Sequence, residues 1–180
     1  MTHATLIPPH QKMKSGYAAP KKPSKKEFKD TRIALLATRW NVEVVEALLA
    51  GAAACLKDWG VPDENIEVLY APGAYELPLA ASAILASGRF DGVVALGAVI
   101  RGDTPHFDFV AGECARGLMD VQLAICRPVG FGVLTVNTPE QAFERCAPGK
   151  TNKGYECAAA VLEMLRLTRH VIGAPTAEGA

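Results

Sequence analysis

Hydrophobic and polar positions alternate between two patterns along most of the chain. Short apolar runs are followed by longer stretches in which apolar residues recur every three or four positions. From residue 31 onward, the short runs predict strands and the longer stretches predict amphipathic helices. The predicted strands are Arg32–Thr38, Asn65–Ala71, Gly92–Ile100 and Gly130–Val136, and the predicted helices are Val42–Trp59, Leu77–Ser87, Pro105–Cys126, Thr138–Cys146 and Tyr155–Val171.

The order of these elements predicts a fold class. Nearly apolar strands that are separated by helices indicate a parallel sheet covered on both faces. Because crossovers between parallel strands are right-handed, the simplest topology is a three-layer α/β/α sandwich with a flavodoxin-like, four-stranded parallel sheet. We expect Asn41 to cap the first helix and Gly60 to end it.

Ligands of such sheets bind beyond the carboxyl ends of the strands. This rule brings four segments to one rim: Thr38–Asn41, Pro72–Glu76, Ile100–His106 and Val136–Thr138. The third segment has the clearest chemistry, because its turn opens a helix and helix N-termini attract phosphate. His106 follows that turn and can act as a general acid or base near neutral pH. A lone histidine is more often structural, but its position after an anion-binding turn favours a functional role.

Other candidate residues, on the rim and in a second, cationic group, admit two interpretations each. Trp40 can stack on a flat ring or pack under a loop. Glu76 can bind ligand hydroxyls or interact with a helix dipole. Arg145 and Lys153 are suited to a phosphate and a carbonyl, respectively, or are surface charge. The Gly149-Lys150-Thr151 triplet lacks the rest of a P-loop, which excludes nucleotide hydrolysis.

Length and charge predict one domain with two tails. The 180 residues are 49% hydrophobic, which is enough for one well-buried domain over residues 31–172. Residues 1–30 hold seven lysines against Glu27 and Asp30, so this segment carries +5 and the remainder −5. We expect a disordered basic leader over residues 1–30 and a flexible tail over 173–180. A basic leader can touch nucleic acid, but a solubilising extension is the preferred interpretation, and we expect no nucleic-acid partner.

The sequence gives no sign of export or metal binding. It shows no secretory signal and no apolar stretch of about 20 residues that could span a membrane, which predicts a cytoplasmic protein. The five cysteines lack metal-ligand spacing, so we expect buried free thiols and no structural zinc.

Five segments together resemble the lumazine synthase family. The resemblance runs through residues 31–170, and Ile100-Arg101-Gly102-Asp103-Thr104-Pro105-His106 is its most specific motif. The other segments are Thr38-Arg39-Trp40-Asn41, Pro72-Gly73-Ala74-Tyr75-Glu76-Leu77-Pro78, Phe131-Gly132-Val133-Leu134-Thr135 and Glu140-Gln141-Ala142-Phe143-Glu144-Arg145.

The resemblance implies a reaction and a set of site residues. The reaction joins 5-amino-6-ribitylaminouracil to 3,4-dihydroxy-2-butanone 4-phosphate and gives 6,7-dimethyl-8-ribityllumazine, without metal or cofactor. His106 matches the proton-transfer residue. Asp103, Thr104 and Arg145 match the residues that bind the phosphate. The residues that match the binding site of the pyrimidine and its ribityl chain are Trp40, Asn41, Ala74, Tyr75, Glu76, Ala98, Val99, Ile100, Phe131 and Lys153.

The resemblance also implies an assembly. It predicts a homopentamer in which each site receives Phe131, Arg145 and Lys153 from an adjacent subunit. The short loop Pro148–Lys153 favours a sixty-subunit shell. Riboflavin synthase is a further partner that the resemblance leaves open. Trp40 and Tyr75 stand where family members commonly have Phe.

The alternative function is that of a non-catalytic riboflavin- or lumazine-binding protein. A flavodoxin-like electron carrier is disfavoured, because no phosphate-binding loop follows the first strand.

Overall fold

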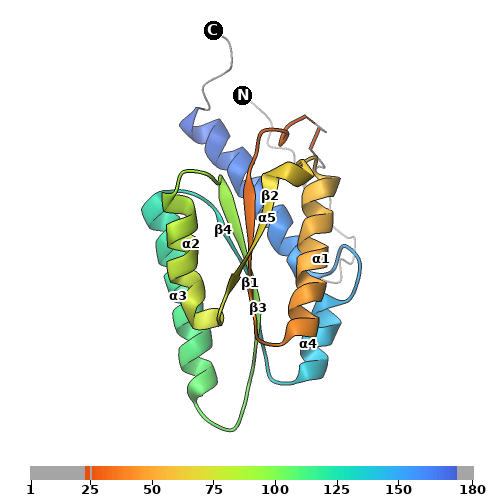
Figure 1. Ribbon diagram of the computed structural model, residues 1–180, viewed down its shortest axis with the longest axis vertical. Helices are drawn as coiled ribbons and strands as arrows, with labels where there is room; N and C mark the ends of the chain where they lie inside the picture. Colours follow the sequence, from red (N-terminus) through yellow and green to blue (C-terminus); the bar gives the residue numbers. More distant parts are fainter. Residues whose placement is uncertain (1–22, 25, 174–180) are drawn as a thin grey trace, which may run out of the picture.

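The computed structural model describes residues 23–24 and 26–173 and has a parallel four-stranded sheet between two helix layers (Figure 1). The sheet order is β2-β1-β3-β4, which confirms the predicted three-layer, flavodoxin-like fold. The elements in chain order are β1 (Ile33–Thr38), α1 (Val42–Asp58), β2 (Ile66–Ala71), α2 (Leu77–Ala86), β3 (Gly92–Ile100), α3 (His106–Ile125), β4 (Val129–Val136), α4 (Pro139–Cys146) and α5 (Lys153–Ile172).

Side chains alternate between the two faces of the sheet along each strand. Ile33, Leu35 and Ala37 of β1 belong to the core under α1, α4 and α5. Ala34 and Leu36 belong to the separate core under α2 and α3. Each face of β1 is therefore completely buried, as the apolar sequence predicts.

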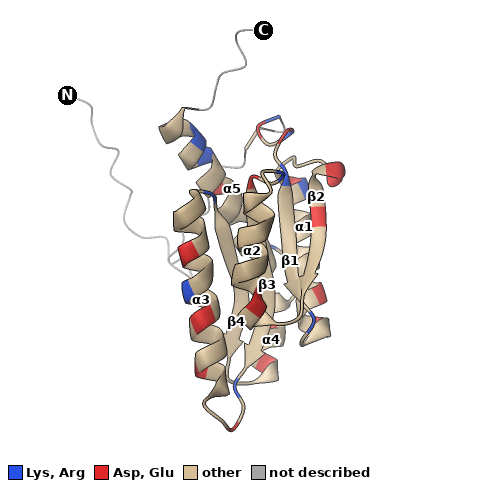
Figure 2. Cartoon of the chain, turned by 60° about the vertical axis from the view of Figure 1, so that its left-hand side comes forward, with Lys and Arg blue, Asp and Glu red and all other residues tan. Residues whose placement is uncertain are grey.

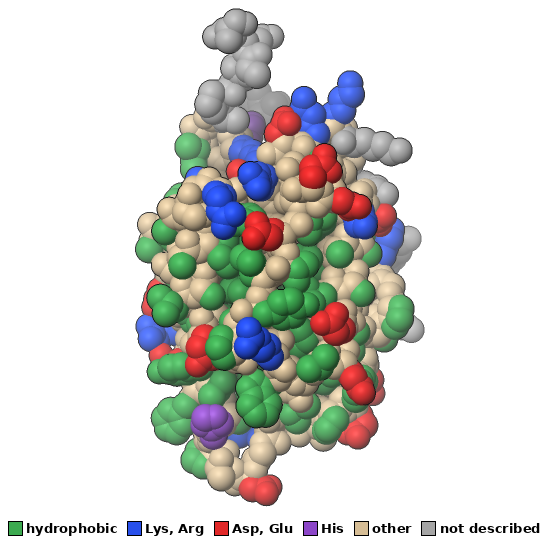
Figure 3. Space-filling view, in the orientation of Figure 1, with side chains coloured by type: hydrophobic (Ala, Val, Ile, Leu, Met, Phe, Trp, Pro, Cys, Tyr) green, Lys and Arg blue, Asp and Glu red, His purple; other side chains and the backbone are tan. Residues whose placement is uncertain are grey.

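The edge strand β2 is less covered than the inner strands. Its Val68 and Tyr70 side chains are 43% and 49% exposed, respectively. Figure 3 shows hydrophobic side chains along the middle of the face that presents β2. The prediction of a sheet covered on both faces therefore holds for β1 and β3 and is wrong for β2, because helices pack over the centre of the sheet and leave its edge open.

Helix α5 begins two residues earlier than predicted because of Asn152. The buried Asn152 side chain accepts hydrogen bonds from the backbone N–H groups of Gly154 and Tyr155, and thus caps α5. Its amide nitrogen donates to the carbonyl oxygens of Ala47 in α1 and Cys146 in α4. One side chain thereby joins three helices and places Lys153 at the first position of α5 rather than in the preceding loop.

The packed part of the chain begins before residue 31. Phe28 lies within the predicted leader, yet it is completely buried, with its ring centroid 6.2 Å from that of Trp59. The adjacent Glu27 is paired with Arg166 of α5, whose guanidinium also lies 5.9 Å from the Phe28 ring centroid. The prediction of a disordered leader over residues 1–30 is therefore wrong for residues 26–30, because the Phe28 ring fills part of the core. Residues 1–22 and 25 of the predicted leader lie outside the described residues, and so do residues 174–180 of the predicted tail.

Four of the five cysteines are buried free thiols, as predicted. Cys126, which ends α3 with φ of 55°, is exposed, so the expectation of a buried thiol is wrong for this residue. Burial raises the pKa of the Cys157 thiol to about 12, and burial together with the charge of Asp58 raises the pKa of Cys55 to about 12.

These thiols predict a loss of stability in alkali. In the unfolded chain a thiol ionises near its ordinary pKa of 9.0, well below its value when buried. The unfolded state therefore releases protons first, so the free energy of unfolding is preserved below pH 9 and falls above it, by about 1.4 kcal/mol per thiol and pH unit. Urea titrations at pH 8, 9 and 10 measure this slope, and it should be unchanged in Cys126→Ser. A pH-independent urea midpoint would contradict the burial of both thiols.

Charged side chains lie mainly on outer helix faces and in loops (Figure 2). In the part of the chain that the structure describes, no cluster of His, Cys, Asp and Glu side chains is suited to holding a metal ion. Over the same residues, none of the helices combines the length and the apolar character that crossing a bilayer requires.

Candidate functional site

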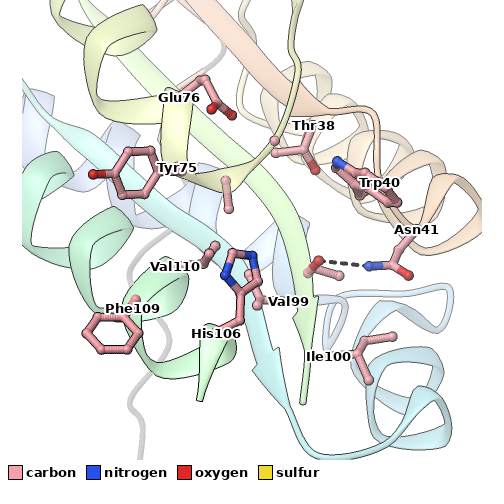
Figure 4. A pocket seen from close by; sticks show the side chains of 13 residues that line it. Thr38, Trp40, Asn41, Tyr75, Glu76, Val99, Ile100, His106, Phe109 and Val110 are labelled. Carbon is pink, nitrogen blue, oxygen red and sulfur yellow. Dashed lines mark hydrogen bonds between the residues drawn. The ribbon is translucent and has the colours of Figure 1, made fainter. Parts of the chain in front are cut away.

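A pocket of about 620 Å³ lies at the carboxyl ends of β1 and β3 (Figure 4). The chain leaves β1 toward β2 on one side and returns to β3 on the other, so this is the point at which the strand order reverses. The pocket is lined by Thr38, Trp40, Asn41, Gly73, Ala74, Tyr75, Glu76, Ala98, Val99, Ile100, His106, Phe109 and Val110.

The turn after β1 supplies Trp40 and Asn41. The Trp40 side chain is 72% exposed and lines the pocket, so its ring is available for stacking and is not packed in the core. Asn41 adopts the left-handed conformation with φ of 55°, which asparagine tolerates better than most residues. Its side-chain nitrogen donates to the carbonyl oxygen of Ala98 at 2.9 Å.

This bond corrects the predicted role of Asn41. The side chain makes no capping hydrogen bond to α1. It instead joins the turn after β1 to the end of β3, at the edge of the sheet where the pocket lies. The carbonyl group of Ala98 is thereby held in place and retains one lone pair for a ligand.

The turn after β2 forms a second wall of the pocket. Gly73 allows close approach here, since a β-carbon at this position would lie 3.1 Å from a Glu76 carboxylate oxygen and 3.4 Å from the Trp40 ring. The Glu76 carboxylate and the Trp40 indole therefore both border the space that a side chain on Gly73 would fill. Tyr75 is 61% exposed, and Figure 4 shows its hydroxyl pointing away from His106.

His106 enters the pocket from the first residue of α3. The β3 residues Val99 and Ile100 and the α3 residue Val110 also line the cavity. The imidazole is exposed to solvent, and Figure 4 shows it between Val99 and Val110. A proton donor and acceptor is thus held beside an apolar wall, opposite Trp40.

The turn that precedes His106 is braced by Arg101. Its guanidinium donates two hydrogen bonds to Asp108, at 2.6 and 3.2 Å, and lies 4.1 Å from the Phe107 ring centroid. These hydrogen bonds hold the pKa of the Asp108 carboxyl below its ordinary value and raise the pKa of Arg101. Arg101 also donates its backbone N–H to the carbonyl oxygen of Val136. The turn between Arg101 and His106 is therefore fixed at both ends while its own residues remain exposed.

Comparison with known families identifies the chain. The family model of 6,7-dimethyl-8-ribityllumazine synthase matches residues 30–169. The chain belongs to this family. The resemblance expected from the five sequence segments is thereby confirmed, and the protein belongs to an enzyme family of riboflavin biosynthesis, which implies a transferase.

In this member of the lumazine synthase family, one chain brings together only part of the predicted site. Nine predicted residues line the pocket: Trp40, Asn41, Ala74, Tyr75, Glu76, Ala98, Val99, Ile100 and His106. Asp103 and Thr104 lie in the exposed turn before His106 and are not among the lining residues.

Three other predicted residues of this family member lie away from the pocket lining. Phe131 is on β4 and 45% exposed, Arg145 donates to the Gln141 carbonyl oxygen in α4, and Lys153 pairs with Glu156 in α5. Arg145 and Lys153 therefore present their charges on the outer surface of the chain, beyond the pocket that the same chain forms.

Sequence reasoning missed four of the residues that line this pocket. Phe109 and Val110 follow His106 by three and four positions, which places them on its side of α3, and this spacing was a readable signal. Gly73 and Thr38 fall inside segments that were assigned to the rim. Only the packing of β1 against β3 shows that the Thr38 side chain reaches the cavity.

Proposed function

We propose that this protein condenses 5-amino-6-ribitylaminouracil with 3,4-dihydroxy-2-butanone 4-phosphate and forms 6,7-dimethyl-8-ribityllumazine, with release of phosphate and water. The family match over residues 30–169 carries the proposal. The pocket supports it, because an exposed Trp40 ring, the Glu76 carboxylate and the His106 imidazole suit a flat heterocycle, a polyol chain and a proton transfer.

The reaction requires proton transfers and a bound phosphate. The amine of the pyrimidine attacks the ketone, and water leaves as the imine forms. Phosphate is then eliminated after a proton is removed, and a second water is lost when the ring closes. His106 moves protons in these steps, and the turn at Asp103 and Thr104 holds the phosphate with Arg145. Much of the rate acceleration comes from holding two reactants side by side.

The site is completed by a neighbouring copy of the chain. Arg145, Lys153 and Phe131 lie outside the pocket lining of their own chain and present exposed side chains. We infer that they complete the pocket of the adjacent subunit in a homopentamer, and that the short loop before α5 allows pentamers to build a sixty-subunit shell. An isolated chain would then lack the guanidinium of its phosphate site.

The direct test mixes purified protein with both substrates and follows the absorbance and fluorescence of the lumazine. Product formation supports the proposal. A folded oligomer that binds riboflavin but forms no product would favour a non-catalytic binding protein. Equilibrium sedimentation of the same sample tests the pentamer and the shell.

His106→Ala should slow the reaction without abolishing it. Loss of a proton-transfer group commonly costs a factor of about 10²–10⁴, and we expect the lower end, about 10²-fold in kcat, because reactant positioning survives. Steady-state kinetics with both substrates measure the loss, and riboflavin binding confirms an intact pocket. Complete inactivity of a folded variant would contradict the positioning argument.

A further inference from the structure

We infer that the hydroxyl of Thr38 is an additional substrate contact, which receives a hydroxyl group of the polyol chain. This inference rests on the proposed function and assigns a role to a residue that the family resemblance leaves without one. It begins from an unpaired atom. Among side chains of the described residues, Thr38 Oγ1 is the one buried nitrogen or oxygen that has no hydrogen-bond partner.

The position of Thr38 in β1 explains why a hydroxyl there is unusual. Thr38 lies on the same face of the sheet as Ala34 and Leu36, which are buried in the apolar core under α2 and α3. It is the last residue of the strand and lines the pocket, with 3% of its surface exposed. The apolar column therefore ends in a polar group at the point where the core meets the cavity.

Gly97 on β3 lies directly beside the Thr38 side chain. A β-carbon on Gly97 would lie 3.0 Å from Thr38 Oγ1 and 3.1 Å from its methyl carbon. Any larger residue at position 97 would press on the Thr38 side chain, so the glycine preserves the orientation in which the hydroxyl borders the pocket. Figure 4 shows the Thr38 oxygen on the pocket side of the strand end.

The surroundings of Thr38 indicate which part of a ligand it meets. The carboxylate of Glu76 and the indole of Trp40 both border the space that a side chain on Gly73 would fill, in the same wall of the pocket. A hydroxyl and a carboxylate beside an aromatic face match a polyol chain that is attached to a planar ring. A buried hydroxyl without a partner is destabilising, and a ligand hydroxyl that reaches it offsets part of this cost and so adds to affinity.

The test compares two flavins in the full-length protein. Riboflavin carries a ribityl chain and lumiflavin carries a methyl group in its place. Thr38→Val retains the shape of the side chain and removes the hydroxyl, and Thr38→Ser retains the hydroxyl as the matched control. We expect Thr38→Val to weaken riboflavin binding about fivefold, as the loss of one hydrogen bond predicts, while lumiflavin binding stays within about twofold of wild type. Thr38→Ser should bind both flavins like wild type.

A second readout separates this role from a structural one. Without ligand, Thr38→Val should unfold at a higher urea concentration than wild type, because a buried unpaired hydroxyl is replaced by a methyl group. Unchanged riboflavin affinity in Thr38→Val, or an equal loss for both flavins, would overturn the inference. Absence of product in the two-substrate assay would instead overturn the proposed reaction, and the flavin comparison would still decide the contact.

Discussion

Arg145→Ala is expected to lower kcat/KM for the phosphorylated substrate by about 10²- to 10³-fold, the usual loss when one preorganised donor to a developing anion is removed. Arg145 provides a planar fork that binds two phosphate oxygens at once. Its present contacts, to the Gln141 carbonyl oxygen and to Glu144 at 3.9 Å, leave the guanidinium on the surface. Steady-state kinetics at saturating pyrimidine substrate measure the effect.

The matched control removes another cation from the same region. Lys150→Ala alters the loop before α5, where the Lys150 side chain is exposed, and we expect it to retain the wild-type kcat/KM. Wild-type kinetics in Arg145→Ala would contradict the proposed phosphate contact. An equal loss in Lys150→Ala would mean that general surface charge matters and that the guanidinium fork does not.

Mixing two impaired variants tests whether Arg145 acts on the neighbouring subunit. Trp40→Ala damages the pocket of its own chain, whereas Arg145→Ala damages the pocket of the next chain in the ring. Random co-assembly of the two variants would then restore about one quarter of the sites, because a site needs one intact element from each neighbour. Failure of the mixture to regain activity would place Arg145 in the pocket of its own chain.

Gly154→Ala should lower the free energy of unfolding by about 3 kcal/mol, near the upper end of the cost of overpacking a core. A β-carbon at position 154 would collide with the backbone carbonyl group of Leu48 and approach the Asn152 amide oxygen. Backbone atoms cannot rotate aside, so α5 would have to move away from α1. The denaturation midpoint in urea measures the loss.

The control for this variant is a second helical glycine. Gly112 lies in α3, and a β-carbon there would meet nothing within 4 Å. Gly112→Ala should therefore stabilise the protein by about 0.5–1 kcal/mol, through better helix propensity and a restricted unfolded state. Equal urea midpoints for Gly154→Ala and wild type would show that α1 and α5 do not approach as closely as described.

The fold could be predicted because local and long-range patterns agree. The sequence from Ile33 to Ala37 is apolar at every position, which is typical of a strand buried on both faces. The rule for the carboxyl ends of parallel strands then placed Trp40, Glu76 and His106 at one rim, and the pocket contains all three.

Three features could not be predicted because they depend on tertiary contacts. Asn41 precedes a helix, as a cap does, and nothing in the local sequence reveals that its amide reaches Ala98 on a distant strand. The start of α5 depends on carbonyl groups of α1 and α4 that Asn152 meets only after folding. The unpaired state of the Thr38 hydroxyl follows from burial, and sequence alone does not describe burial atom by atom.

The anchoring of Phe28 determines where this protein can be shortened. Residues 30–169 match the family model, which makes residue 30 an inviting start for a trimmed version. Such a version would lose the ring that covers Trp59 and the carboxylate that pairs with Arg166. Versions intended for crystallisation or for carrying an N-terminal fusion should therefore begin ahead of Ser24, whose carbonyl oxygen accepts a hydrogen bond from the backbone of Glu27.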